Sequence, residues 1–233
     1  MKRVLVVVLA ILPASAVEAT QVIDDFESGT NPNQWGWTNG GGGAFIIQPD
    51  GGNPGAWLDS GVPYFSDHPN LTSLPPVGTA LQSALASGTL SSARVDIQRL
   101  DTSDVNNCHP VAQEQSTFSL AFIDIHSDPG GAVIEAHADN GPASPAGTFP
   151  WTTVTFSIDS SSIDVPAGWV LNADPDINYT WQDLMHNIDG IRFWVVNPEQ
   201  NTFDGCSHLG ADNIVITYGT ADDVIFDNGF DTP

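Results

Sequence analysis

Short alternations of apolar and polar residues run along most of the chain, and glycine and proline separate them. In the stretch SARVDIQRL, residues 92–100, Val95 and Ile97 fall on one side and Asp96 and Gln98 on the other. This two-residue period is typical of a half-buried β-strand. The pattern predicts an all-β sandwich or barrel, with strands at residues 21–27, 43–48, 55–59, 92–99, 117–127, 132–138, 151–158, 167–172, 190–197 and 211–218.

Helical patterns are nearly absent, and one short helical turn is expected within TWQDLMHNI, residues 180–188. The sequence contains no internal repeat and no second block of distinct composition. We therefore expect a single domain over residues 20–218. A Gly-Thr-Ala break separates it from a C-terminal tail, residues 219–233.

The first 19 residues have the composition of a secretory signal peptide. Lys2 and Arg3 precede the apolar run VLVVVLAILPA, and small residues follow up to Ala19. The run is shorter than the roughly 20 apolar residues that cross a bilayer, and no later segment is apolar enough. We expect a secreted, extracellular or cell-surface protein, with the periplasm as an alternative, and no membrane insertion of the mature chain.

The charge balance narrows the range of partners. Five Lys and Arg stand against 28 Asp and Glu, which gives a formal net charge of −23 at pH 7. Such a surface repels nucleic acid and anionic membranes and attracts cations. We expect no nucleic-acid partner, and the acidity permits a calcium site without indicating one.

The two cysteines, Cys108 and Cys206, lie in polar stretches. In an exported protein such a pair is typical of a disulfide, which would stabilise the fold by roughly 4–5 kcal/mol in the chain-entropy model. His109 and His208 lie close to the cysteines in the sequence. A zinc site of two Cys and two His is therefore the alternative, although the spacing fits no zinc-finger pattern.

The candidate chemistry is concentrated in FIDIHSDPGGAVIEAHAD, residues 122–139, where acids and histidines flank a Pro-Gly-Gly turn. A hairpin that pairs Ser127 with Ala132 sets Asp124 opposite Glu135. A slip by one residue would mix polar groups into the buried face. This register predicts that Ala121, Ile123 and Ile125 face the core, and that the outward face consists of Phe122, Asp124, His126, Val133, Glu135 and His137.

Carboxylates and imidazoles on one sheet face are suited to several roles. Opposed neighbours lie about 4.5–5.5 Å apart at Cβ, close enough to share a metal ion, to act as acid and base, or to bind a ligand together. A plain solvated strand face has the same composition. We interpret the face of Asp124, His126, Glu135 and His137 as a ligand-binding face at most.

Aromatic residues add to the case for binding, because sugars present apolar C–H faces that stack on indole rings. The chain has seven Trp. The alternation in GIRFWVVNP, residues 190–198, places Trp194 outward on the side of Arg192. Trp35, Trp37 and Trp57 lie in glycine-rich stretches that one end of a sandwich could bring together, although packing in the core is the alternative for each.

Motifs for catalysis are missing. The sequence has no G-x-S-x-G elbow, no H-E-x-x-H zinc helix, and no phosphate loop or dinucleotide fingerprint. A glycosidase needs only two well-placed carboxylates, so the absence of motifs does not exclude an enzyme. The sequence favours binding over catalysis and identifies no catalytic residue.

Three stretches carry a resemblance to a known group of domains. They are VIDDFESGTNPNQWGWTNGGG at 22–42, PDGGNPGAWL at 49–58, and LMHNIDGIRFWVVNP at 184–198 with LGADNIVITY at 209–218. In this order they resemble galactose-binding-like jelly-roll domains, of the carbohydrate-binding and bacterial laminin-B-like (laminin domain IV-like) types. The resemblance implies an antiparallel jelly-roll β-sandwich.

The resemblance also implies a structural Ca²⁺ between the first and last strands. Glu27 would supply one carboxylate and Asp212 another, with a loop carbonyl near Asp50–Asn53 completing the shell; Asp24 and Asp25 are rival ligands. Calcium takes six to eight oxygen ligands of this kind. The alternative is that the acids form a solvated strand start and that Asp212 and Asn213 form a turn.

Together these observations predict an exported, non-enzymatic binding module that recognises a carbohydrate or an extracellular surface component, with a structural calcium. The first alternative is a structural or adhesion protein that binds protein partners. The second is a calcium-dependent polysaccharide hydrolase or lyase that uses the 124–137 face.

Overall fold

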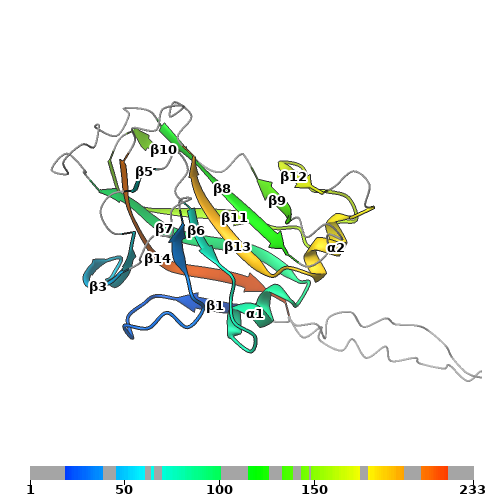
Figure 1. Ribbon diagram of the computed structural model, residues 1–233, viewed down its shortest axis with the longest axis horizontal. Coiled ribbons are helices and arrows are strands. Elements are labelled where there is room, and N and C mark those ends of the chain that lie inside the picture. The colour runs from blue at the N-terminus through cyan, green and yellow to red at the C-terminus, as the bar shows by residue number, and fades with distance from the viewer. Residues whose placement is uncertain are drawn as a thin grey trace, which may run out of the picture.

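Two antiparallel β-sheets packed face to face form the protein in a computed structural model (Figure 1). The structure describes residues 19–38, 46–60, 64–65, 70–100, 115–125, 133–138, 143–146, 148–173, 178–196 and 206–219. The first sheet has the strand order β11 (Phe149–Ser157), β7 (Leu90–Leu100), β14 (Cys206–Tyr218), β4 (Gly55–Asp59) and β3 (Ile46–Gly52), and β1 (Thr20–Asp24) and β5 (Tyr64–Phe65) also pair with β14.

The second sheet has the order β12 (Trp169–Asn172), β9 (Ile134–Ala138), β8 (Gln115–Asp124), β13 (Gly190–Val196), β6 (Asn70–Ser73) and β2 (Gly36–Thr38), with β10 (Ala143–Ala146) paired to β8. The chain crosses from one sheet to the other several times, as between β6, β7 and β8, and so builds both sheets at once. This path and the antiparallel pairing confirm the predicted jelly-roll β-sandwich.

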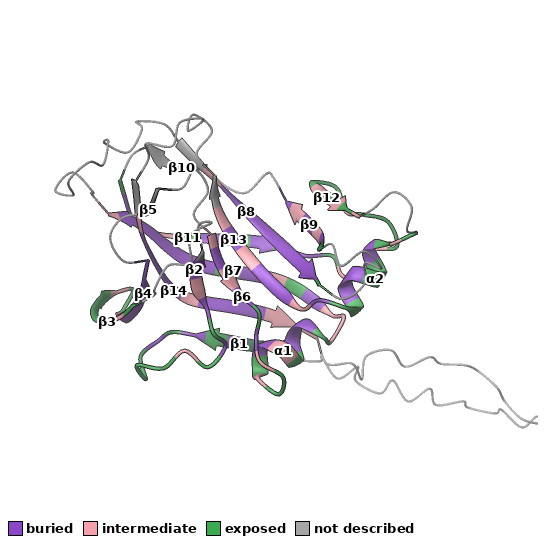
Figure 2. Cartoon of the chain, in the orientation of Figure 1, coloured by how far each residue is buried: buried purple, intermediate pink, exposed green. Residues whose placement is uncertain are grey.

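The alternation along β7 determines which side chains enter the core. Val95 and Ile97 are buried between the sheets, as the sequence predicted, and Ala93 is buried beside them. Trp35 and Trp37, which are 0% and 2% exposed, are also core residues, so they form no sugar platform. Figure 2 shows buried residues along the strands of both sheets and exposed residues mainly on the connections and on edge strands.

Two short helices cover parts of the sandwich. α2 (Trp181–His186) occupies the expected helical segment and begins with a capping box, in which Thr180 and Asp183 bond reciprocally. α1 (Ala80–Leu85) was not expected. Its buried residues, Leu81, Ala84 and Leu85, nonetheless have helical spacing.

Several predicted boundaries were wrong for local reasons. The first strand ends at Asp24 rather than at residue 27, because Phe26 has a φ of 57° and accepts a turn hydrogen bond from Gly29 N–H. β2 and β6 are strands of three and four residues that the periodicity did not indicate. β14 begins at Cys206, earlier than expected, and continues through a bulge after Asp212.

Some predictions lie outside the described residues. These are the signal peptide up to residue 18, the tail beyond residue 219, His126, and Cys108 with its disulfide or zinc alternative. Within the described part of the chain, no helix is long and apolar enough to cross a membrane.

Candidate functional site

The pairing of β8 with β9 differs by one residue from the predicted register. Asp124 pairs with Ile134, and Ala121 pairs with His137. Consequently Phe122 and Asp124 point toward the core, and the prediction that they face outward was wrong. Thr117, Ser119 and Ala121 lie on the outer side of β8, and Phe118, Leu120 and Phe122 lie on the inner side. The contrast lies in the first half of the strand, whereas the prediction relied on the residues next to the Pro-Gly-Gly turn. The larger side chains, including Phe122 stacked on Trp169 at 5.4 Å, occupy the core.

Asp124 is therefore not part of an outward polar face. It is 1% exposed and accepts a hydrogen bond of 2.5 Å from Tyr179 Oη. A buried carboxylate needs such a partner, because an unpaired one would be costly. Asp124 ties the segment before α2 to the sheet.

The outer face of the second sheet still carries the other predicted residues. Glu135 and His137 point outward from β9, while Ile134, Ala136 and Ala138 of the same strand are buried. Together with five residues of neighbouring strands they form what we call the polar face, defined as Asn70, Thr72, Glu135, His137, Asn172, Arg192 and Trp194.

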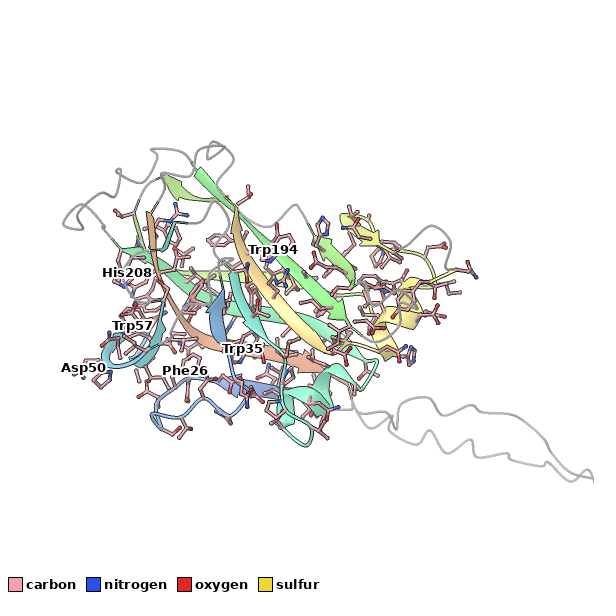
Figure 3. The ribbon with its side chains drawn as sticks, viewed as in Figure 1. Phe26, Trp35, Asp50, Trp57, Trp194 and His208 are labelled. Atoms are coloured by element: carbon pink, nitrogen blue, oxygen red, sulfur yellow. The ribbon has the colours of Figure 1, made fainter. Side chains whose placement is uncertain are left out.

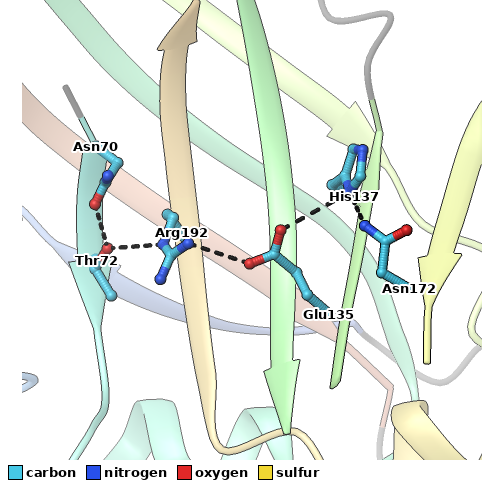
Figure 4. Close-up of polar contacts among 6 residues, drawn as sticks. All are labelled: Asn70, Thr72, Glu135, His137, Asn172 and Arg192. Carbon is cyan, nitrogen blue, oxygen red and sulfur yellow. Dashed lines mark hydrogen bonds and ion pairs between the residues drawn. The ribbon is translucent and has the colours of Figure 1, made fainter. Parts of the chain in front are cut away.

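Hydrogen bonds and ion pairs connect the polar face across the sheet (Figure 4). Arg192 Nη1 lies 3.1 Å from Glu135 Oε2, and Arg192 Nε donates to Thr72 Oγ1 at 3.3 Å. On the other flank, His137 Nδ1 is 3.8 Å from Glu135 Oε1 and 3.4 Å from Asn172 Nδ2. The row thus runs perpendicular to the strands, from β6 to β12.

Small residues in the middle strand allow this row to form. Ala121 of β8 pairs with Arg192 on one side and His137 on the other, and it is fully buried. Because the side chain of Ala121 is a single methyl group, Arg192 and Glu135 can reach each other across β8. Their side chains are only 27% and 16% exposed, so the row is held in place rather than free in solvent.

Trp194 lies on the same side of β13 as Arg192, as predicted. The Arg192 guanidinium lies 5.4 Å from the Trp194 ring centroid, and the His137 ring lies 5.8 Å away at 35°. No described residue accepts a hydrogen bond from Trp194 Nε1. Figure 3 shows Trp194 well separated from Trp57, which is 7% exposed on the other sheet.

Electrostatics on the polar face centre on Glu135. Partial burial raises the pKa of Glu135, and the neighbouring charges of Arg192 and His137 oppose that rise. Glu135 is the only carboxylate of the polar face, because Asp124 is turned inward. A hydrolase that works with two carboxylates therefore gains no second acid from the described part of this face.

A second cluster joins the turn between β3 and β4 to the middle of the first sheet. Asp212 Oδ2 accepts from Asn53 N–H at 2.6 Å, and Glu27 Oε1 accepts from Ala56 N–H at 3.1 Å. Asp96 accepts from Asn53 Nδ2 at 3.2 Å. Burial, followed by the charges of Asp96 and Glu27, raises the pKa of Asp212 to about 6, although its backbone hydrogen bonds oppose the rise.

The glycines of this turn leave room for the carboxylates. A Cβ on Gly52 would lie 2.7 Å from the carbonyl oxygens of Gly55 and Ala56 and 2.8 Å from Asp212 Oδ2. A Cβ on Gly55 would lie 2.0 Å from Glu27 Oε1. Two carboxylates and two carbonyls therefore surround one glycine turn, which is the donor chemistry that Ca²⁺ prefers.

The rival acids lie elsewhere. Asp25 accepts from Glu27 N–H at 3.2 Å and is exposed, and Asp24 is buried against Trp35 Nε1 and Asn33. Within the described ranges, no group of three or more His, Cys, Asp or Glu side chains could hold a metal ion by itself. An ion at the turn would thus depend on backbone carbonyls for much of its shell.

Sequence reasoning missed four participants in these two sites. Asn70, Thr72 and Asn172 lie on strands that are distant in the chain from Glu135, and only sheet pairing brings them together. The alternation of β7 predicted that Asp96 points outward, but it could not show that Asp96 faces Asn53 and Asn213.

Comparisons with known proteins add solved structures only. No protein-family model and no curated protein matches the chain. A family 11 carbohydrate-binding module from Clostridium thermocellum, solved with a β-1,3-1,4-mixed-linked tetrasaccharide, is 20% identical, with 88% of this chain and 98% of that chain covered and a TM-score of 0.45.

Two further structures are similar at the same level. The family 11 module of the cellulosomal cellulase Lic26A-Cel5E of Clostridium thermocellum is 17% identical, with coverage of 88% and 97% and a TM-score of 0.46. A carbohydrate esterase, vb_24B_21 from the Shiga toxin-encoding bacteriophage phi24B, is 11% identical, with coverage of 87% and 100% and a TM-score of 0.42.

Proposed function

We propose that the protein is a non-enzymatic carbohydrate-binding module, exported from the cell, and that its ligand lies across the polar face. The observation that carries the proposal is Trp194, fixed between Arg192 and His137 on the outer face of a sheet. An indole ring offers a stacking surface for the apolar face of a sugar. The surrounding planar groups supply donors and acceptors for sugar hydroxyls.

The length of the row supports an extended ligand. It crosses β6, β13, β8, β9 and β12, which are successive neighbours in the sheet. With strands about 4.8 Å apart, the distance from Asn70 to Asn172 is about 19 Å. A row of this length suits an oligosaccharide better than a single sugar.

Preorganisation of the polar face supports binding. Glu135 is held by Arg192 and His137, and Arg192 is also bonded to Thr72. Side chains that are already fixed lose little freedom when a ligand arrives, which favours affinity.

The test is calorimetric titration with a panel of soluble polysaccharides. Replacing Trp194 with Ala is expected to weaken binding about thirtyfold, since removal of a central aromatic contact costs about 2 kcal/mol. The matched control is Trp151→Ala, which removes a partly exposed Trp from the first sheet and should change affinity less than twofold. Equal affinities of the two variants would place the ligand elsewhere.

We also propose a structural Ca²⁺ at the glycine turn, held by Glu27, Asp212 and carbonyl oxygens of residues 52–56. Bound calcium would neutralise the repulsion among Glu27, Asp96 and Asp212, and it would link the turn after β1, the β3–β4 turn and β14. The proposal rests on the gathering of three carboxylates, to which no Lys or Arg in the described part of the chain is hydrogen-bonded.

Thermal unfolding with and without EDTA tests this site. Added Ca²⁺ is expected to raise the unfolding midpoint by mass action, and Glu27→Gln or Asp212→Asn should abolish that rise. Asp25→Asn, an equal change of charge at the exposed neighbour, should retain it. If Ca²⁺ does not change the unfolding midpoint of the unmodified chain, the calcium proposal is wrong. The proposal of a glycan-binding site on the polar face does not depend on this result.

A further inference from the structure

A pocket of about 510 Å³ lies at the end of the sandwich where β7 begins and α2 packs. Residues 87–91, residues 158–161, Gln182 and His186 line it. None of these residues belongs to the polar face or to the glycine turn. The pocket is therefore a separate candidate for a ligand.

Most of the hydroxyl protons in the pocket wall are already used within the protein. Four of its hydroxyl groups donate to internal acceptors: Ser87 to Ala84 O at 2.7 Å, Thr89 to Gly219 O at 2.7 Å, Ser91 to Thr217 O at 3.3 Å, and Ser161 to Asp159 Oδ1 at 2.8 Å. Ser87 Oγ also accepts from Thr89 N–H at 3.1 Å, so Thr89, Ser91 and Ser161 are the hydroxyl groups that still offer lone pairs to the pocket.

His186 contributes another acceptor. Its Nδ1 lies 2.7 Å from Gln182 O, and a carbonyl only accepts, so Nδ1 carries the proton. The neutral ring then has its lone pair on Nε2. That atom faces Gly88, where a Cβ would lie only 3.2 Å away. Gly88, at a φ of +68°, thus leaves Nε2 open toward the pocket.

The chemistry of the wall indicates what it would bind. Acceptors predominate, the carboxylate of Asp159 adds a negative charge, and Leu90 and Ile158 supply an apolar floor. Ser160 and Gln182 add a few donors. The net charge of −23 raises the local concentration of cations.

We propose that this pocket binds a small organic ammonium compound. The ammonium N–H groups donate to Asp159, His186 Nε2 and the hydroxyl oxygens, while the methylene groups of the ligand cover Leu90 and Ile158.

Titration of the ¹⁵N-labelled chain with 1,4-diaminobutane at pH 8 tests the proposal by NMR. Amide shifts are expected to saturate and to concentrate at residues 87–91, 158–161 and 182–186. Asp159→Asn, which retains an acceptor for Ser161, is expected to weaken binding about fivefold. The matched control is Asp164→Asn, which removes the same charge from an exposed residue outside the lining and should leave binding unchanged.

Three results would overturn the proposal. Equal weakening by the two variants would show diffuse attraction to an acidic surface. Equal binding of 1,4-butanediol, which has the same length without the charges, would identify a site for neutral polyols instead. Shifts that do not saturate, or that lie away from the pocket, would show that no site exists there.

Discussion

Acidification of the calcium-free protein is expected to stabilise the fold through Asp212. Burial first, and the charges of Asp96 and Glu27 after it, raise the pKa of this carboxyl from 3.8 to about 6. A group whose pKa is higher in the native state than in the unfolded chain binds its proton more tightly in the native state. Folding stability therefore increases as the pH falls from about 7 through 6 toward 4.

The size of the effect follows from the shift. At about 1.36 kcal/mol per pH unit, the change in the pKa of Asp212 corresponds to about 3 kcal/mol at most. That amount is large beside the roughly 5–15 kcal/mol that stabilises a typical domain. The increase should be complete near pH 4, where the unfolded chain also begins to bind this proton.

The assay is urea unfolding at pH 7, 6, 5 and 4 after removal of calcium, for the unmodified chain and for Asp212→Asn. The other carboxylates titrate in both proteins, so the difference in free energy of unfolding isolates Asp212. We expect the free energy of unfolding of the unmodified chain to increase relative to that of the variant as the pH falls. A difference that stays flat, or that changes in the opposite direction, would refute the assignment of a raised pKa to this group.

Two pairs of substitutions test the packing around these sites. Gly55→Ala is expected to destabilise the fold by about 2–3 kcal/mol, because φ at Gly55 is +81° and the new Cβ would collide with Glu27. Gly29→Ala should cost roughly 1 kcal/mol, because φ is +68° but no atom lies within 4 Å of the new Cβ. Equal losses of stability in denaturant unfolding would contradict this. Asp124→Ala should destabilise the fold by about 1–3 kcal/mol, because it removes a buried acceptor of Tyr179 Oη. Glu135→Ala should cost under about 1 kcal/mol. Similar costs would support the register in which both residues face solvent.

The fold was predictable where polar residues marked one side of a strand. In β7, Asp96 and Gln98 could only face outward, so the core positions of Val95 and Ile97 followed. In β8 the contrast is limited to Thr117 and Ser119 against Phe118 and Leu120, and it disappears at Ala121 and Ile123, next to the predicted turn. Its orientation was decided by the volume of Phe122 against Trp169, a contact between distant segments.

The two candidate sites were predictable to different degrees. Glu27, Asp212 and the turn at residues 50–53 came from the resemblance, and the structure brings Glu27 and Asp212 to that turn. Arg192 and Trp194 followed from alternation within one strand. The contact of Arg192 with Glu135 required the pairing of β13 and β9 with β8. It also required a residue as small as Ala121 between them, and no local pattern contains that information.

The pairing of β1 with β14 has a mechanical consequence. Thr20 lies opposite Tyr218, at the end of the ladder where the chain both enters and leaves the sandwich. A force that pulls these two points apart loads that pair first and the Gln21–Thr217 pair next, so the strands separate one rung at a time. Shearing would require all the rungs to break together, because ladder bonds lie perpendicular to the strands. The first strand should therefore peel away under low force, whatever the thermodynamic stability of the sandwich behind it.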